Sequence, residues 1–151
     1  MKILVTGAAG YIGSILVPEL LKEGCEIIAV DNFMYNQNSL LGCCYDEKLT
    51  IARGDARDEG LVSKYIKDVD YIFPLACLTG APLCDKDPIG ARTTNLEAIK
   101  ILLKIRSKSQ RIVFPTSNSG YGIGQEGIYC DEKTPLNPIS LYGRLKTEAE
   151  K

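Results

Sequence analysis

Short runs of apolar residues recur along the chain and are separated by stretches with helical spacing. The first run, residues 2–6 (KILVT), is rich in β-branched residues and continuous rather than alternating, which is typical of a strand buried on both faces of a parallel sheet. Pro74 weakens the prediction for the fourth run, because proline cannot donate a hydrogen bond to a neighbouring strand. The other runs, each predicted to form a strand, cover residues 26–30, 49–52, 71–76 and 111–115.

Helices are predicted between these strands. The first covers residues 14–23 and ends at Gly24, and Pro18 within it is expected to bend the helix or to remove one hydrogen bond. The remaining predicted segments are helices at 61–66 and 88–106, a loop rich in glycine, asparagine and proline at 118–138, and a last helix that begins near Ser140 and is still running at Lys151.

Strands that alternate with helices imply βαβ units with right-handed crossovers, and hence an α/β fold with a doubly wound parallel sheet. With 151 residues the chain is long enough for one domain and too short for two ordinary ones, so a single domain is predicted over residues 1–151. An unrelated flavodoxin-like sheet fits the alternation equally well. Only the motifs distinguish the two.

Charge and apolar run length exclude several classes of partner. The formal net charge of −1 provides no attraction to nucleic acid or to anionic lipid, so neither is predicted as a partner. No apolar run approaches the roughly 18 residues that a membrane span needs. The apolar N-terminus runs directly into glycines without a cleavage region, and we interpret it as a buried strand rather than a signal peptide.

The sequence contains six cysteines and no histidine. Ser-His-Asp triads, histidine-based acid–base catalysis and histidine-containing zinc sites are therefore excluded, and without a C-x-x-C pair no metal site is predicted. The cysteines are interpreted as reduced thiols in a cytoplasmic protein, although the adjacent Cys43 and Cys44 could be sensitive to oxidation.

A glycine-rich motif, GAAGYIG at residues 7–13, lies directly between the first strand and the first helix. Glycines at this position allow a tight turn and the close approach of a pyrophosphate, and the N-terminus of the helix offers free N–H groups and the positive end of a dipole. A flexible turn is the alternative. The strand before the motif and the helix after it are what a dinucleotide-binding loop requires.

Two acidic residues follow later strands. Asp31 ends the second strand, 24 residues after Gly7, close to the offset of an acid that binds the adenosine ribose. Because a carboxylate accepts hydrogen bonds from ribose hydroxyls and repels a 2′-phosphate, NAD is predicted rather than NADP. Asp55, after the third strand, could accept from the adenine amino group. A turn at the end of the strand is the alternative for Asp31, and an Asx turn or a helix cap is the alternative for Asp55.

Tyr142 and Lys146 lie four residues apart at the start of the last helix and are predicted to share one face. A nearby ammonium would lower the phenol pKa and make Tyr142 a proton shuttle, although this spacing alone occurs in many helices. Ser117 follows the fifth strand, where a substrate hydroxyl or carbonyl could bind. A polar turn is the alternative for that segment.

Together these motifs resemble the extended short-chain dehydrogenase/reductase family, and in particular its NAD-dependent sugar-nucleotide epimerase and dehydratase group, which UDP-galactose 4-epimerase typifies. The resemblance runs along the whole chain, through VTGAAGYIGS, VDN, GDARD, LAC, TTNLEA, FPTSNSGYG and LYGRLK. It implies a Rossmann-type sheet, NAD as the cofactor and a nucleotide-sugar as the substrate.

The resemblance also implies roles for individual residues. Those implied to bind NAD are Gly7, Gly10, Tyr11, Ile12 and Gly13 at the pyrophosphate, Asp31 and Asn32 at the adenosine ribose, Asp55 and Ala56 at the adenine, and Leu75, Ala76, Cys77 and Asn95 along the wall beside the cofactor. Those implied to be catalytic are Ser117, Tyr142 and Lys146, with Lys146 also holding the nicotinamide ribose. In the implied reaction Tyr142 removes a sugar hydroxyl proton while a hydride passes to the nicotinamide, and an epimerase returns the hydride on the other face.

Members of this family continue for roughly as long again, with a C-terminal domain that binds the nucleotide-sugar, and no such domain is predicted within these residues. Residues 1–151 alone are therefore expected to have little turnover. The resemblance further implies a homodimer formed through residues 88–106 and 140–151. An NAD-dependent dehydrogenase or reductase on the same scaffold, and a catalytically inactive cofactor-binding fragment, are the alternative functions.

Asn118 and Ser119 bear on the type of reaction. Dehydratases of the resembled family carry an Asp-Glu pair just after the residue that matches Ser117, and related decarboxylases carry Glu at the position of Ser119. Elimination needs an acid for the departing hydroxyl and a base for the proton beside the keto group. The Asn118 amide and the Ser119 hydroxyl can act as neither acid nor base near neutral pH. No elimination is therefore predicted.

Overall fold

The computed structural model describes residues 1–124, 127 and 129–151. Part of the predicted loop at 118–138, namely residues 125, 126 and 128, lies outside the described residues. The chain divides into two compact units. The first contains residues 1–76 and 100–115, and the second contains residues 77–99 and 116–151.

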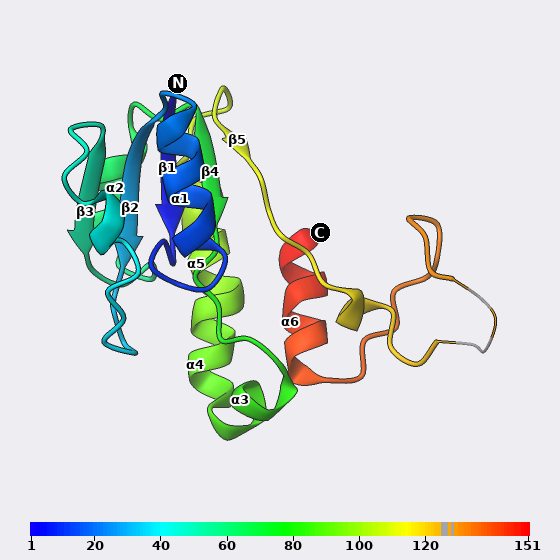
Figure 1. Cartoon of the computed structure of the whole chain (residues 1–151). Coiled ribbons are helices and arrows are strands. Elements are labelled where there is room, and N and C mark those ends of the chain that lie inside the picture. Colours follow the sequence, from blue (N-terminus) through cyan, green and yellow to red (C-terminus); the bar gives the residue numbers. More distant parts are fainter. Residues whose placement is uncertain (125–126, 128) are drawn as a thin grey trace. The chain divides into compact units, whose positions relative to one another are not determined.

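The first unit is built on a five-stranded parallel sheet with the strand order β3-β2-β1-β4-β5 (Figure 1). This order confirms the doubly wound fold and is that of a Rossmann-type sheet, whereas a flavodoxin-like sheet places its first strand between the second and third. The strands are β1 (Lys2–Thr6), β2 (Glu26–Asp31), β3 (Leu49–Arg53), β4 (Tyr71–Pro74) and β5 (Arg111–Ile112).

Helix α1 (Gly13–Lys22) covers one face of the sheet and α2 (Glu59–Ile66) covers the other (Figure 1). Helix α1 continues through Pro18. Helix α2 begins where the Asp58 carboxylate accepts a hydrogen bond from the Leu61 amide at 3.0 Å, which satisfies one of the free N–H groups at the helix start.

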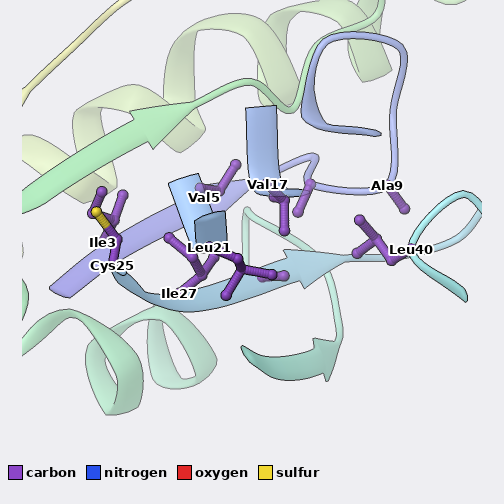
Figure 2. Packing of buried hydrophobic residues seen from close by; sticks show 10 residues of the cluster. Ile3, Val5, Ala9, Val17, Leu21, Cys25, Ile27 and Leu40 are labelled. Atoms are coloured by element: carbon purple, nitrogen blue, oxygen red, sulfur yellow. The ribbon is translucent and has the colours of Figure 1, made fainter. Parts of the chain in front are cut away.

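The core between α1 and the sheet is formed by side chains that alternate along the strands. Ile3 and Val5 of β1 pack with Val17 and Leu21 of α1, as Figure 2 shows. Leu4, which lies between Ile3 and Val5 and points to the opposite face, is also fully buried. Burial on both faces explains the continuous apolar pattern of the first strand.

The second unit is helical. Its core is formed by Leu78, Cys84, Ala91, Leu96 and Leu145. Its elements are α3 (Ala81–Lys86), α4 (Pro88–Arg92), the π-helical turn η2 (Thr93–Glu97), the beginning of α5 (Ala98–Ile105), the 3₁₀ turn η3 (Asn118–Gly120) and α6 (Leu141–Glu150).

Three details differ from the sequence prediction. The strands predicted at 71–76 and 111–115 end early, at Pro74 and Ile112, although the Val113 amide still donates to the Ile72 carbonyl at 2.9 Å. The helix predicted at 88–106 is divided by the π-helical turn. Helix α3 was not predicted, because its six residues are too few to show a helical period.

Candidate nucleotide-binding and catalytic site

In the first unit, the carboxyl ends of β1, β2, β3 and β4 meet at one edge of the sheet because all strands are parallel. The strand order reverses between β1 and β4, so this is the topological switch point at which open α/β sheets bind ligands. The predicted cofactor residues 7–13, 31–32, 55–56 and 75–76 follow these four strands and therefore share this edge.

The three glycines of the loop meet different constraints. Gly7 has φ +69°, and a Cβ added there would lie 2.5 Å from the Ala76 nitrogen. A Cβ at Gly13 would lie 2.2 Å from the Ala8 carbonyl oxygen, whereas one at Gly10 would lie 3.1 Å from the Gly7 carbonyl oxygen. The fold thus requires glycine at positions 7 and 13. At position 10 the requirement is weaker, and the absence of a side chain leaves the backbone open to a ligand.

Backbone N–H groups at the start of α1 are available to an anion. Within the part of the chain that the structure describes, the amides of Tyr11, Ile12 and Gly13 have no acceptor, while those of Gly10 and Ser14 are bonded. The Tyr11 side chain is 95% exposed. Three unpaired N–H groups at the positive end of a helix dipole suit a phosphate or pyrophosphate group.

The Asp31 side chain is 6% exposed and supports the glycine loop. Its Oδ2 accepts from the Ala9 amide at 2.9 Å, and its Oδ1 accepts from the Phe33 amide at 2.7 Å and from Gln37 Nε2 at 3.2 Å. A carboxylate oxygen can accept two hydrogen bonds, so Oδ2 retains capacity for a further donor. Asp31 therefore stabilises the turn after β2, as the alternative interpretation expected. Its Oδ2 can still accept a hydrogen bond from a ligand.

Asp55 is already engaged by its neighbours. Its carboxylate accepts from Arg57 Nε at 2.8 Å, from Arg57 Nη2 at 2.6 Å and from the Arg57 amide at 2.9 Å. These bonds, with a smaller contribution from the nearby Asn32, hold the pKa of Asp55 below its usual value. The Asx turn considered as an alternative is therefore present, and Ala56 beside it is buried.

Leu75 and Ala76 follow β4. The Leu75 amide donates to the Thr6 carbonyl at 2.9 Å, which extends the pairing of β4 with β1 by one bond. Ala76 then lies against Gly7, whose missing side chain allows this approach. Cys77, the next residue, begins the second unit.

In the second unit the structure brings Ser117 and Tyr142 together. The Ser117 hydroxyl lies near enough to the Tyr142 phenol to favour the phenolate form. Burial acts in the other direction and raises the pKa of Tyr142 above its usual value, with a smaller contribution from the Cys77 thiol. In the chain by itself burial therefore outweighs the effect of Ser117 on this pKa, while the lowering expected from Lys146 together with a bound nicotinamide stays a prediction.

Lys146 is 5% exposed, and burial lowers the pKa of its ammonium, while Cys77 and Glu150 act to raise it. Helix α6 carries Tyr142 and Lys146 one turn apart, as predicted, and begins where Ser140 Oγ accepts from the Gly143 amide at 3.0 Å. A Cβ at Gly143 would lie 2.5 Å from the Ser119 carbonyl oxygen. Glycine there lets α6 lie directly against the segment that carries Ser117.

Asn95 lies in the π-helical turn and is 2% exposed. Its Oδ1 accepts from the Leu78 amide at 2.8 Å and its Nδ2 donates to the Leu78 carbonyl at 2.9 Å. Asn95 therefore fixes the backbone next to Cys77, and within this unit it supports the wall of the site. Cys84, which the sequence did not single out, donates to the same Leu78 carbonyl at 3.2 Å.

The chain matches the NAD dependent epimerase/dehydratase family over residues 3–151. It belongs to this family. Over its whole length the chain is 35% identical to UDP-glucose 4-epimerase of Lactobacillus helveticus, of which it covers 46%. The family member thus spans about half the length of the curated relatives that it matches.

Two solved structures bound to NAD resemble the chain closely. The TM-score is 0.91, at 29% identity, with dTDP-glucose 4,6-dehydratase DesIV from Streptomyces venezuelae, and 99% of this chain matches 49% of that one. The TM-score is 0.88 with UDP-glucuronic acid 4-epimerase from Bacillus cereus in complex with UDP-glucuronic acid and NAD. The identity to that structure is 28%, and 99% of this chain matches 50% of it. The relatives thus include both epimerases and a dehydratase.

Other features of the chain bear on partners and metals. All six cysteines are free. Among the described residues, no three histidine, cysteine, aspartate or glutamate side chains are grouped as a metal site requires. None of the helices in the described ranges has the length and apolar character of a membrane span.

Proposed function

We propose that this family member is the cofactor-binding and catalytic portion of an NAD-dependent sugar-nucleotide epimerase. The observation that carries the proposal is the proximity of Ser117 to Tyr142, with Lys146 buried one helical turn further on. A phenol held by a hydroxyl and followed by a buried ammonium can exchange a proton with a substrate hydroxyl without histidine.

The residues of the first unit fit NAD. The amides of Tyr11, Ile12 and Gly13 would bind the pyrophosphate, and the free capacity of Asp31 Oδ2 would accept from the adenosine ribose. Asn32, Asp55 and Ala56 would line the adenine, and Leu75 and Ala76 would pass beside the cofactor. When bound, NAD supplies the hydride acceptor and donor.

The residues of the second unit would handle the proton and the oxygen. Tyr142 takes the proton of a sugar hydroxyl as the carbinol is oxidised and returns it when the keto group is reduced. Ser117 donates a hydrogen bond to the same oxygen in both directions. Lys146 holds a ribose hydroxyl and stabilises the phenolate, while Asn95 keeps the segment at Cys77 in place.

Asp31 is expected to make the protein prefer NAD over NADP. Asp31→Asn should weaken NAD binding by about tenfold or more, since a hydrogen bond to a charged group contributes about 1.5–3 kcal/mol, and should reduce the discrimination against NADP. Calorimetric titration with both nucleotides measures this. Asp46→Asn, the same change at an exposed turn of the same unit, should alter neither affinity.

Because Asp31 also supports Ala9 and Phe33, thermal unfolding of the variant has to be recorded alongside. An unmodified protein that binds NADP as tightly as NAD would contradict the role assigned to Asp31.

Asn118 and Ser119 favour epimerisation over dehydration. Neither side chain titrates near neutral pH, so the acid and base that elimination needs are missing directly after Ser117. The protein that carries this chain, given NAD and a panel of nucleotide-sugars in deuterated water, should convert a sugar to its epimer without loss of water. Formation of a deuterated 6-deoxy product would refute this proposal, and release of a keto product would indicate a dehydrogenase.

We also propose that the protein forms a homodimer through residues 88–106 and 140–151. Ile89 and Leu103 on the first of these segments are exposed apolar side chains, which a partner copy could cover. Light scattering should show twice the protomer mass. A monomer that persists at high concentration would argue against this interface.

A further inference from the structure

Helix α6 carries a third residue in register with the catalytic pair. Tyr142, Lys146 and Glu150 are spaced four residues apart and therefore lie along one face of the helix. Glu150 Oε2 accepts a hydrogen bond from Thr116 Oγ1 at 2.7 Å, and Thr116 directly precedes Ser117. The segment at 116–117 thus lies against α6, with Thr116 bonded to Glu150 near one end of the helix and Ser117 close to Tyr142 near the other.

Lys146 needs an anion nearby, because a buried ammonium is costly unless it is paired. Among the described residues, the titratable groups that act on its charge are Glu150 from its own helix and Cys77 from the segment after β4, and Tyr142 lies one turn before it on the same helix face. Burial raises the pKa of both the Cys77 thiol and the Tyr142 phenol, which keeps them neutral near pH 7. Glu150 is the one group of these three that is a carboxylate.

We propose that Glu150 is a positioning residue for Lys146: its carboxylate, fixed by the Thr116 hydroxyl, is the counter-charge that holds the buried ammonium in the catalytic site. The importance of Lys146 for catalysis rests on the proposed function. The pairing of Glu150 with Lys146 does not, because it depends only on residues of the second unit.

The experiment follows the titration of Lys146 in the 151-residue chain, without cofactor or sugar. Lysine labelled with ¹³C at Cε gives one NMR signal for each lysine, and Lys146→Arg identifies the signal of Lys146 by its loss. The pH at which this signal titrates is compared among the unmodified chain, Glu150→Gln and Glu148→Gln. Glu148 is a matched control, since it lies on the same helix and its replacement removes the same charge from a different face.

Glu150→Gln is expected to move the Lys146 titration to lower pH, because the ammonium loses its anion while the amide oxygen can still accept from Thr116. Glu148→Gln should leave the titration where it is. No movement in Glu150→Gln, or an equal movement in both variants, would overturn the proposal, since the second result would reflect net charge alone.

Thr116→Val provides a second variant, which keeps the carboxylate and removes only its hydrogen-bond donor. Thr116→Val should move the Lys146 titration to lower pH by a smaller amount than Glu150→Gln does. If Glu150→Gln does not fold, Thr116→Val is the variant that tests the proposal. An unmoved titration in Thr116→Val would then contradict the proposal. Failure of the proposed function is distinguishable, because it would appear as absent NAD binding or turnover while the titration of Lys146 still responds to Glu150.

Discussion

Replacing Tyr142 with phenylalanine is expected to lower kcat by about 10²- to 10⁴-fold, the usual contribution of a positioned acid–base group. The substitution removes only the phenolic oxygen, which in the proposed function exchanges a proton with the sugar hydroxyl and which lies near Ser117. The Kd for NAD should stay nearly unchanged, because the residues proposed to bind the pyrophosphate and the adenosine belong to the first unit. Steady-state turnover with an epimerisable nucleotide-sugar and calorimetric titration with NAD measure the two quantities in the protein that carries this chain.

Tyr121→Phe is the matched control for this variant. Tyr121 belongs to the same unit, and its hydroxyl donates to the Asp131 carbonyl at 3.1 Å, apart from Ser117 and Lys146. Its loss should leave kcat within about twofold, as expected for a surface substitution worth no more than about 0.5 kcal/mol. If Tyr142→Phe retains full turnover, or if Tyr121→Phe loses as much, Tyr142 is not the proton shuttle.

Alanine at Gly7 is expected to destabilise the chain strongly. A side chain at φ +69° costs about 1–2 kcal/mol, and forcing a Cβ into a packed backbone costs about 1–3 kcal/mol more. The free energy of unfolding should therefore fall by about 2–5 kcal/mol, as measured by urea unfolding. Gly42→Ala provides a control, because a Cβ there has open space within 4 Å.

Gly10→Ala should show the opposite pattern. Its Cβ needs a movement of only a few tenths of an ångström, so stability should change by about 1 kcal/mol or less. The methyl group would stand beside the unpaired amides of Tyr11 and Ile12 and should weaken NAD binding by about tenfold or more, or about 1.4 kcal/mol. Equal stability of Gly7→Ala and Gly10→Ala, or unchanged NAD affinity in Gly10→Ala, would contradict the roles assigned to the two glycines.

Most of the sheet could be predicted from the sequence, because strands buried on both faces leave continuous apolar runs such as KILVT. The ends of β4 and β5 could not, since they depend on which neighbouring strand supplies a hydrogen-bond partner. The π-helical turn at Thr93–Glu97 was also out of reach. It places the Asn95 side chain where it bonds the Leu78 backbone, a contact between segments that are distant in the sequence.

The candidate site could be predicted where a role follows from position along the chain. Tyr142 and Lys146 share a helix face, and the glycine loop opens α1, as the spacing indicated. Contacts between distant segments could not be predicted, and these include the bond between Thr116 and Glu150 and the thiol of Cys77 near Lys146. For the same reason the sequence did not predict that burial raises the pKa of Tyr142 in the chain by itself, because burial depends on packing that spacing does not reveal.

We propose that this family member binds NAD with the pyrophosphate at the start of α1. The most direct test is a titration of the ¹⁵N-labelled chain with NAD, followed through the backbone amide signals. We expect saturable shifts that are largest at Tyr11, Ile12 and Gly13, whose N–H groups have no acceptor in the described part of the chain. An absence of saturable shifts, or shifts that leave these three amides unmoved, would contradict the account.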